Sequence, residues 1–163
     1  MDRESQPSPG IVFTSPVHFV AFGFGSGLSP IAPGTAGTLL GVAVYLLMHG
    51  MTWWAYWALT VLLFVAGIWI CGQSSRALGA HDHGGIVWDE IVGYLVAMGL
   101  GPVGWPWTVA GFVLFRAFDI CKPWPIALID RRVGGGSGIM LDDVVAGVYC
   151  ALTLQVSALL LAP

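Results

Sequence analysis

The chain has 163 residues, of which 56% are hydrophobic and only 9% are charged. A soluble domain carries about 25% charged residues, so this composition excludes an ordinary soluble protein and indicates an integral membrane protein. The formal net charge of −3 provides no basic field for nucleic acid, and we expect no nucleic-acid partner.

The charged residues lie in three short windows, at 2–4, 76–90 and 116–143. The stretches between these windows contain no Asp, Glu, Lys or Arg. An unpaired charge in the hydrocarbon of a bilayer is costly. The pattern therefore predicts a chain that crosses a membrane repeatedly and presents nearly all of its charges, and with them its chemistry, on one wet face.

The N-terminal residues 1–16 form a polar, proline-bearing segment that we expect to be flexible. It precedes a single membrane-embedded domain at 17–163. We expect the short apolar run at 17–24 either to lie along the membrane interface or to pack inside the protein. The glycine- and proline-rich segment at 25–38 is expected to be irregular until about Thr35, where a helix could be capped.

Five apolar stretches follow as candidate membrane helices, at 39–49, 53–72, 91–100, 107–115 and 144–163. The second and the fifth are long enough for about 30 Å of helix, which spans the hydrocarbon core. The other three span about half of it, so they must extend into their charged flanks or stop partway. The predicted fold class is an all-α polytopic membrane helical bundle of about five membrane-embedded helices, with some short or partial crossings.

Tryptophan residues mark the side of the membrane that lacks charge. The predicted turns at 50–52 and 101–104 are each followed within five residues by at least two tryptophans, as in the aromatic belt of a membrane interface. All six Lys and Arg residues lie on the opposite side, which the positive-inside rule makes cytoplasmic. We therefore expect a multi-pass protein whose N-terminus and active site are cytoplasmic.

The strongest internal signal is a pair of similar phrases, DEIVG from Asp89 and DDVVAG from Asp142. Each begins with two adjacent carboxylates, continues with β-branched residues and places a glycine one turn on. We expect the doublets to open the third and the fifth helix, and glycines allow the backbones of membrane helices to approach closely. Two helices that met on these faces would bring up to four carboxylates together. The candidate metal ligands are Asp89, Glu90, Asp142 and Asp143.

Such a cluster cannot remain fully ionised without a cation. Ligation by oxygen alone favours Mg²⁺ or Mn²⁺ over zinc. The alternative is that acids at helix N-termini only complement the helix dipole and cap free N–H groups. Asp82 lies between two histidines, but no cysteine or third histidine is near, so we expect it to be a further Mg²⁺ ligand or an acid beside the ligands.

Cationic residues and a glycine-rich stretch suggest a phosphate site. Arg116, Asp119 and Lys122 stand three residues apart at the end of the fourth helix, and a glycine-rich loop at 134–138 precedes the second acid doublet. Such cations beside close backbone N–H donors suit a phosphate. The alternative is an ion pair, contacts with anionic lipid head groups and a flexible loop. The candidate phosphate-binding residues are Thr35, Thr38, Arg116, Lys122, Arg131 and Arg132.

Four blocks of sequence, at 30–38, 82–93, 115–125 and 135–147, carry a resemblance to the phosphatidylglycerophosphatase A family of bacterial lipid phosphatases. The resemblance runs from about residue 17 to the end. It implies Mg²⁺-dependent hydrolysis of the terminal phosphomonoester of phosphatidylglycerophosphate to phosphatidylglycerol and inorganic phosphate at the bacterial inner (cytoplasmic) membrane. The implied partners are this phospholipid substrate and the membrane lipids.

On this interpretation the two doublets, helped by Asp82 or Asp119, hold one or two Mg²⁺ ions that neutralise the phosphate and activate water. Arg116 and Lys122 clamp the phosphoryl group, while Arg131 or Arg132 contacts the outer phosphodiester. An aspartyl-phosphate on Asp119 or Asp82 is the alternative route. The expected catalytic residues are Asp82, Asp89, Glu90, Asp119, Asp142 and Asp143.

Two rival functions fit parts of the pattern. A small membrane transporter or channel subunit would use acids and bases along an ion path, but it predicts charges near midspan rather than at one side. A CDP-alcohol-type phosphotransferase would also use clustered aspartates and a metal. Its D-G-x-x-A-R phrase is absent from the sequence.

Overall fold

The computed structural model describes residues 9–80 and 83–161, and every regular element in these ranges is a helix. The predicted all-α fold class is therefore confirmed for the described part. The elements are α1 (Pro9–Thr14), α2 (Pro16–Ala21), the 3-10 helix η1 (Gly23–Leu28), α3 (Pro33–Met48), α4 (Trp53–Leu78), α5 (Trp88–Leu100), α6 (Trp105–Cys121), α7 (Ile126–Arg132) and α8 (Gly135–Leu161).

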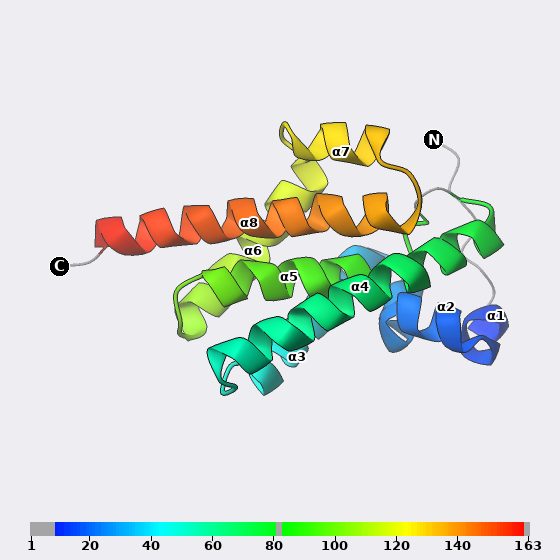
Figure 1. Cartoon of the computed structure of the whole chain (residues 1–163), viewed down its shortest axis with the longest axis horizontal. Coiled ribbons are helices and arrows are strands. Elements are labelled where there is room, and N and C mark those ends of the chain that lie inside the picture. Colours follow the sequence, from blue (N-terminus) through cyan, green and yellow to red (C-terminus); the bar gives the residue numbers. More distant parts are fainter. Residues whose placement is uncertain (1–8, 81–82, 162–163) are drawn as a thin grey trace.

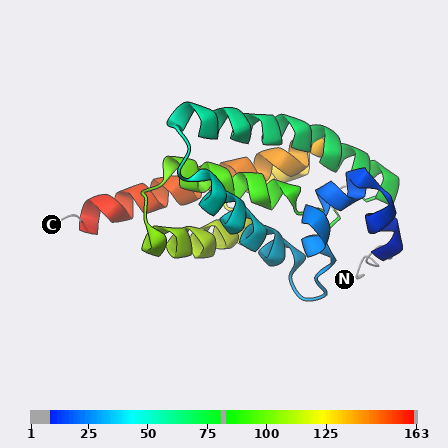
Figure 2. The ribbon, with the colours of Figure 1, turned by 90° about the horizontal axis from the view of Figure 1, so that it is seen from below.

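Helix α5 forms the centre of the fold. It is buried from Trp88 to Met98, apart from Glu90, and α3, α4, α6 and α8 pack around it (Figures 1 and 2). Its sequence is apolar on every side after the first turn, as expected of a helix with neighbours all round. The acid doublet at its start is therefore carried into the interior of the bundle.

Glycines bring the α5 backbone close to two of its neighbours. A Cβ added at Gly147 of α8 would collide with the carbonyl oxygen of Gly93 in α5. On the other side, a Cβ at Gly41 of α3 would lie 3.2 Å from the Cα atom of Ile91. The close approach of α5 and α8 that their glycine register predicts is thereby confirmed.

The two ends of the bundle differ in character. The connections from α3 to α4 and from α5 to α6 lie together at one end, which we call the turn end (Figures 1 and 2). Helices α2 and α7, the last turn of α4 with Arg76, and the start of α8 lie at the opposite, charged end. Both predicted turns, at 50–52 and 101–104, thus fall on the same side.

Two of the described helices, α4 and α8, are long and apolar enough to cross a membrane. In the most apolar part of each, 28% of the residues are buried within the protein. A core helix of a soluble protein hides most of its apolar side chains, whereas these two expose theirs, which indicates a membrane protein. The five crossings predicted from the sequence are not confirmed, because α3, α5 and α6 have 16, 13 and 17 residues.

Two local expectations differ from the structure. The fifth helix begins at Gly135 rather than at Asp142, so the expected glycine-rich loop is helical. The reason is close packing: a Cβ at Gly136 would collide with the carbonyl oxygen of Ile68 in α4. Residues 9–14, which belonged to the predicted polar N-terminal segment, form α1, whose Val12 is buried.

Candidate active site

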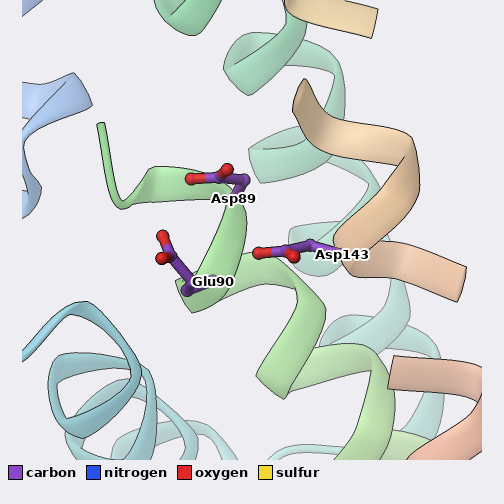
Figure 3. A group of neighbouring side chains, drawn as sticks. All are labelled: Asp89, Glu90 and Asp143. Carbon is purple, nitrogen blue, oxygen red and sulfur yellow. The ribbon is translucent and has the colours of Figure 1, made fainter. Parts of the chain in front are cut away.

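Three carboxyl groups from two helices meet toward the charged end of the protein. Asp89 and Glu90 lie in the first turn of α5, and Asp143 lies inside α8. One oxygen of each lies within 4.8 Å of the other two, and Figure 3 shows the three side chains converging on a common space. The structure thus brings together three of the four carboxylates that the doublets supply.

The start of α5 is fixed by the residue before the doublet. The indole Nε1 of Trp88 donates a hydrogen bond to the carbonyl oxygen of Leu63 in α4 at 3.1 Å. Gly67, one turn further along α4, leaves room for this indole ring and for Met140 of α8. These contacts hold α4, α5 and α8 together next to the carboxylates.

The acid cluster (Asp89, Glu90 and Asp143) is largely shielded from solvent. Asp143 is 3% exposed and Asp89 is 7% exposed, while the side chain of Glu90 is 12% exposed. Asp119, near the end of α6, lies within hydrogen-bonding reach of Asp143. Carboxylates gathered this closely in a poorly solvated place repel one another unless a cation or protons compensate their charge.

The donor set fits a hard divalent cation. Every ligand atom that the acid cluster offers is a carboxylate oxygen, which suits Mg²⁺ or Mn²⁺. Among the residues that the structure describes, the Oδ2 atom of Asp143 is buried and accepts no hydrogen bond. This oxygen is available as a ligand. Asp89, Glu90 and Asp143 could therefore hold such an ion, with Asp119 beside them.

Arg116 of α6 adds a positive group to the acid cluster. One terminal nitrogen, Nη1, lies 3.5 Å from Glu90 Oε1 and also forms an ion pair with Asp119. Its Nε atom is buried and has no hydrogen-bond partner within 9–80 and 83–161. A guanidinium offers donors in a fixed fork that matches a phosphate. Arg116 can therefore hold the acids in place and still donate to a bound phosphate.

The start of α3 closes another side of the site. A Cβ added at Gly34 would collide with Glu90 Oε1 and would lie 2.9 Å from Nη2 of Arg116. The glycine thus permits the first turn of α3, with its free N–H groups, to approach the charged residues. Thr35 is half-buried in this turn, but the buried hydroxyl of Thr38 donates to the carbonyl oxygen of Gly34 at 2.8 Å. Thr38 therefore supports the turn from within.

Asp142 belongs to a separate ion-pair group. Its Oδ2 lies 2.7 Å from the ammonium of Lys122, which also lies 2.7 Å from Oδ1 of Asp130. Burial alone would lower the pKa of Lys122, but its hydrogen bonds to Asp130 and Asp142 outweigh that effect and raise the pKa above its ordinary value. Consecutive residues of a helix point about 100° apart, so Asp142 faces Lys122 while Asp143 faces α5.

Two predicted arginines are not brought to the acid cluster, and Asp82 lies outside the described residues. Arg131 and Arg132 are exposed at the end of α7, and neither takes part in an ion pair within the described ranges. Two contacts of predicted site residues were missed. Gly34, which looks like an ordinary turn residue in the sequence, lies against Glu90 and Arg116. Asp130, outside the acid cluster, pairs with Lys122, and the run of three charges at 130–132 gave no sign of this contact.

Comparison with known proteins identifies the family of this chain. The model of the family described as phosphatidylglycerophosphatase A matches residues 19–158. Phosphatidylglycerophosphatase A of Escherichia coli (strain K12) is 48% identical over 139 residues, which cover 85% of this chain and 81% of the relative. The protein of the same name from Haemophilus influenzae is 42% identical over 156 residues, which cover 93% and 94% of the two chains.

A third relative carries a different name. A protein of Bacteroides thetaiotaomicron, provisionally named a phosphatidylinositol-3-phosphatase, is 38% identical over 146 residues, which cover 85% of this chain and 91% of the relative. No solved structure matches the chain. The family match covers most of the chain and includes every residue of the acid cluster. The chain therefore belongs to the phosphatidylglycerophosphatase A family.

Proposed function

We propose that this chain is a Mg²⁺-dependent phosphatase at the cytoplasmic face of the bacterial inner membrane. It removes the terminal phosphomonoester of phosphatidylglycerophosphate and releases phosphatidylglycerol and inorganic phosphate. The observation that carries this proposal is the meeting of Asp89, Glu90 and Asp143 beside Arg116. Family membership, and the names of the relatives from Escherichia coli and Haemophilus influenzae, supply the substrate.

Each charged side chain has a role in this reaction. Asp89, Glu90 and Asp143 would hold Mg²⁺, with Asp119 at their side. When bound, Mg²⁺ neutralises charge on the phosphate and lowers the pKa of an attacking water. The guanidinium of Arg116 donates to the phosphate oxygens and orients phosphorus toward the water. Positioning and charge neutralisation of this kind supply most of the catalysis of phosphoryl transfer.

The groups around the acid cluster keep it in position. Arg116 holds both Glu90 and Asp119 through the same terminal nitrogen, Nη1. Lys122 fixes α8 at Asp142, the residue directly before Asp143.

In the reaction the oxygen of water bonds to phosphorus, the bond between phosphorus and the glycerol oxygen breaks, and the alcohol leaves with a proton.

The membrane placement follows from the length and charge of the helices. In this proposal α4 and α8 cross the bilayer, and α3, α5 and α6 are embedded beside them as shorter or partial crossings. The cationic residues Arg76, Arg131 and Arg132 lie in the last turns of α4 and α7. The positive-inside rule makes their end cytoplasmic, and the exposed arginines of α7 suit the head groups of anionic lipids.

Phosphate release from phosphatidylglycerophosphate tests the proposal. The purified protein in detergent is mixed with the lipid, and phosphate is measured with Mg²⁺ or with EDTA. We expect release with Mg²⁺ and none with EDTA. Absence of Mg²⁺-dependent release would refute the proposed function. A phosphorylated Asp119 trapped during turnover would replace direct attack by water with an aspartyl-phosphate route.

A further inference from the structure

An apolar groove lies between α4, α5 and α8, on the side of the acid cluster that faces the turn end. It has a volume of about 560 Å³, within the range of about 300–1,000 Å³ that is usual for sites of small ligands. Its floor is α5, and its walls are α4 and α8. The residues that define it best are Trp57, Val61, Phe64, Val96, Leu100 and Val144.

The groove exists because α4 and α8 diverge. The two helices touch near the charged end, where the backbone of Gly136 lies against Ile68 and Gly72. From there they separate toward the turn end, as both views show (Figures 1 and 2). The floor between them is formed by apolar residues of α5. Val61 on the α4 wall and Leu100 at the turn end of the floor are 56% and 44% exposed, so the groove is open to the side.

The groove and the acid cluster lie on the same two helices, α5 and α8. Val144 follows Asp143 directly in α8. On α5, Val96 and Leu100 come seven and eleven residues after Asp89, a spacing that places all three on one face of a helix. The face of α5 that begins with Asp89, a candidate metal ligand, therefore continues as the floor of the groove.

The dimensions and chemistry of the groove fit a hydrocarbon chain. Along its α4 wall the groove extends eleven residues, from Phe64 to Trp53, which is about 16 Å. One leaflet of a bilayer has a hydrocarbon thickness of about 15 Å, half of the core. A lipid whose phosphate is held at the charged end could therefore lay one chain along the whole groove.

We propose that this groove binds an acyl chain of the phospholipid substrate while its terminal phosphate occupies the acid cluster. The proposal rests on the proposed function and deepens it. It assigns to Val61, Val96 and Leu100 the recognition of chain length, and it makes the enzyme selective for long-chain over short-chain forms of the same lipid. Binding energy from the chain serves to position the distant phosphate.

A pair of adjacent substitutions tests the groove. Val61→Trp fills it from an exposed rim, so the fold should tolerate the change. Leu62→Trp is the matched control, because Leu62 is 62% exposed on the same helix and does not line the groove. The assay compares kcat/KM for dioleoyl and dihexanoyl phosphatidylglycerophosphate in detergent with Mg²⁺.

We expect the long-chain to short-chain ratio of kcat/KM to fall about tenfold in Val61→Trp and to keep the wild-type value in Leu62→Trp. An unchanged ratio in Val61→Trp, or equal falls in both variants, would overturn the groove. If the wild-type protein hydrolyses dihexanoyl lipid, the proposed function stands whatever the groove variants do. If it hydrolyses neither lipid, the proposed function itself fails.

A second measurement locates the chain directly. A phosphatidylglycerophosphate with a photoreactive diazirine at the end of one acyl chain is cross-linked to the wild-type protein, and the modified peptides are identified by mass spectrometry. We expect labels within 53–64 and 96–100 that excess unlabelled substrate removes and excess phosphatidylcholine does not. Labels that both lipids remove equally would identify a bystander lipid and overturn the proposal.

Discussion

Gly147 lies so close to Gly93 that a Cβ on Gly147 would collide with the carbonyl oxygen of Gly93. This contact sets the distance between α8 and α5, the two helices that carry the acid cluster. One turn nearer the charged end, the carboxylates of Asp143 and Asp89 face each other. The packing of two glycines and the geometry of the candidate metal site are therefore coupled.

Gly147→Ala should separate the two helices and damage the site. Overpacking of this kind typically costs about 1–3 kcal/mol of stability, and we expect phosphatase activity to fall by more than the loss of folded protein explains. Unfolding in SDS and Mg²⁺-dependent phosphate release measure the two effects. Gly50→Ala is the control, since a Cβ there meets nothing within 4 Å. Wild-type activity in Gly147→Ala would show that the close helix contact is not needed.

Asp143→Asn and Asp89→Asn should each abolish turnover and leave the protein folded. Each substitution removes a charged oxygen ligand, and the loss of metal-assisted stabilisation by several kcal/mol corresponds to a fall in kcat of about 100-fold or more. Initial rates of phosphate release give the measurement. Asp130→Asn is the control: Asp130 is a partly exposed acid outside the acid cluster. Substantial activity in both variants would remove the assignment of these acids.

Arg116→Lys should lower kcat/KM about tenfold, although the positive charge is kept. Lysine lacks the planar fork that can bind Glu90, Asp119 and a phosphate together. A lost charge-assisted hydrogen bond is worth about 1.5–3 kcal/mol. Arg76→Lys, at an exposed position in the last turn of α4, should keep wild-type kinetics. Equal kinetics in the two variants would mean that Arg116 does not contact the phosphate.

Lys122→Met should destabilise the protein, because it leaves the buried carboxylate of Asp142 without its cation. Removing one partner of a buried ion pair typically costs about 3–5 kcal/mol. The double variant Lys122→Met/Asp142→Asn should recover part of this loss in SDS unfolding. A double variant no more stable than Lys122→Met would show that the pair does not couple α6 to α8.

The sequence predicts the main architecture well, because a bilayer restricts where charges can lie. The charge windows and the turns identify five main helices, α3, α4, α5, α6 and α8, and place Asp89 and Glu90 at the start of α5. The glycine register of Gly93 and Gly147 also predicts that α5 and α8 meet. Each of these features can be predicted from a short stretch of sequence or from the exclusion of charged residues from the bilayer.

Other features depend on contacts that a single sequence does not encode locally. The helix of 135–161 starts early because Gly136 packs on α4, and no local preference of a glycine-rich stretch reveals this. Adjacent carboxylates look equivalent in sequence, yet the helix rotates Asp142 toward Lys122 and Asp143 toward α5. The role of Gly34 depends on Glu90 and Arg116, which are distant in sequence. Helix lengths, rather than hydropathy alone, decide how many segments can cross a membrane.

Binding of Mn²⁺, followed by electron paramagnetic resonance in detergent, tests the shared cation site most directly. The wild-type protein and Asp130→Asn should bind the ion saturably and release it when Mg²⁺ is added, whereas Asp143→Asn should bind it at least tenfold more weakly. Equal affinity of Asp143→Asn and the wild-type protein for Mn²⁺ would contradict a cation held by Asp89, Glu90 and Asp143.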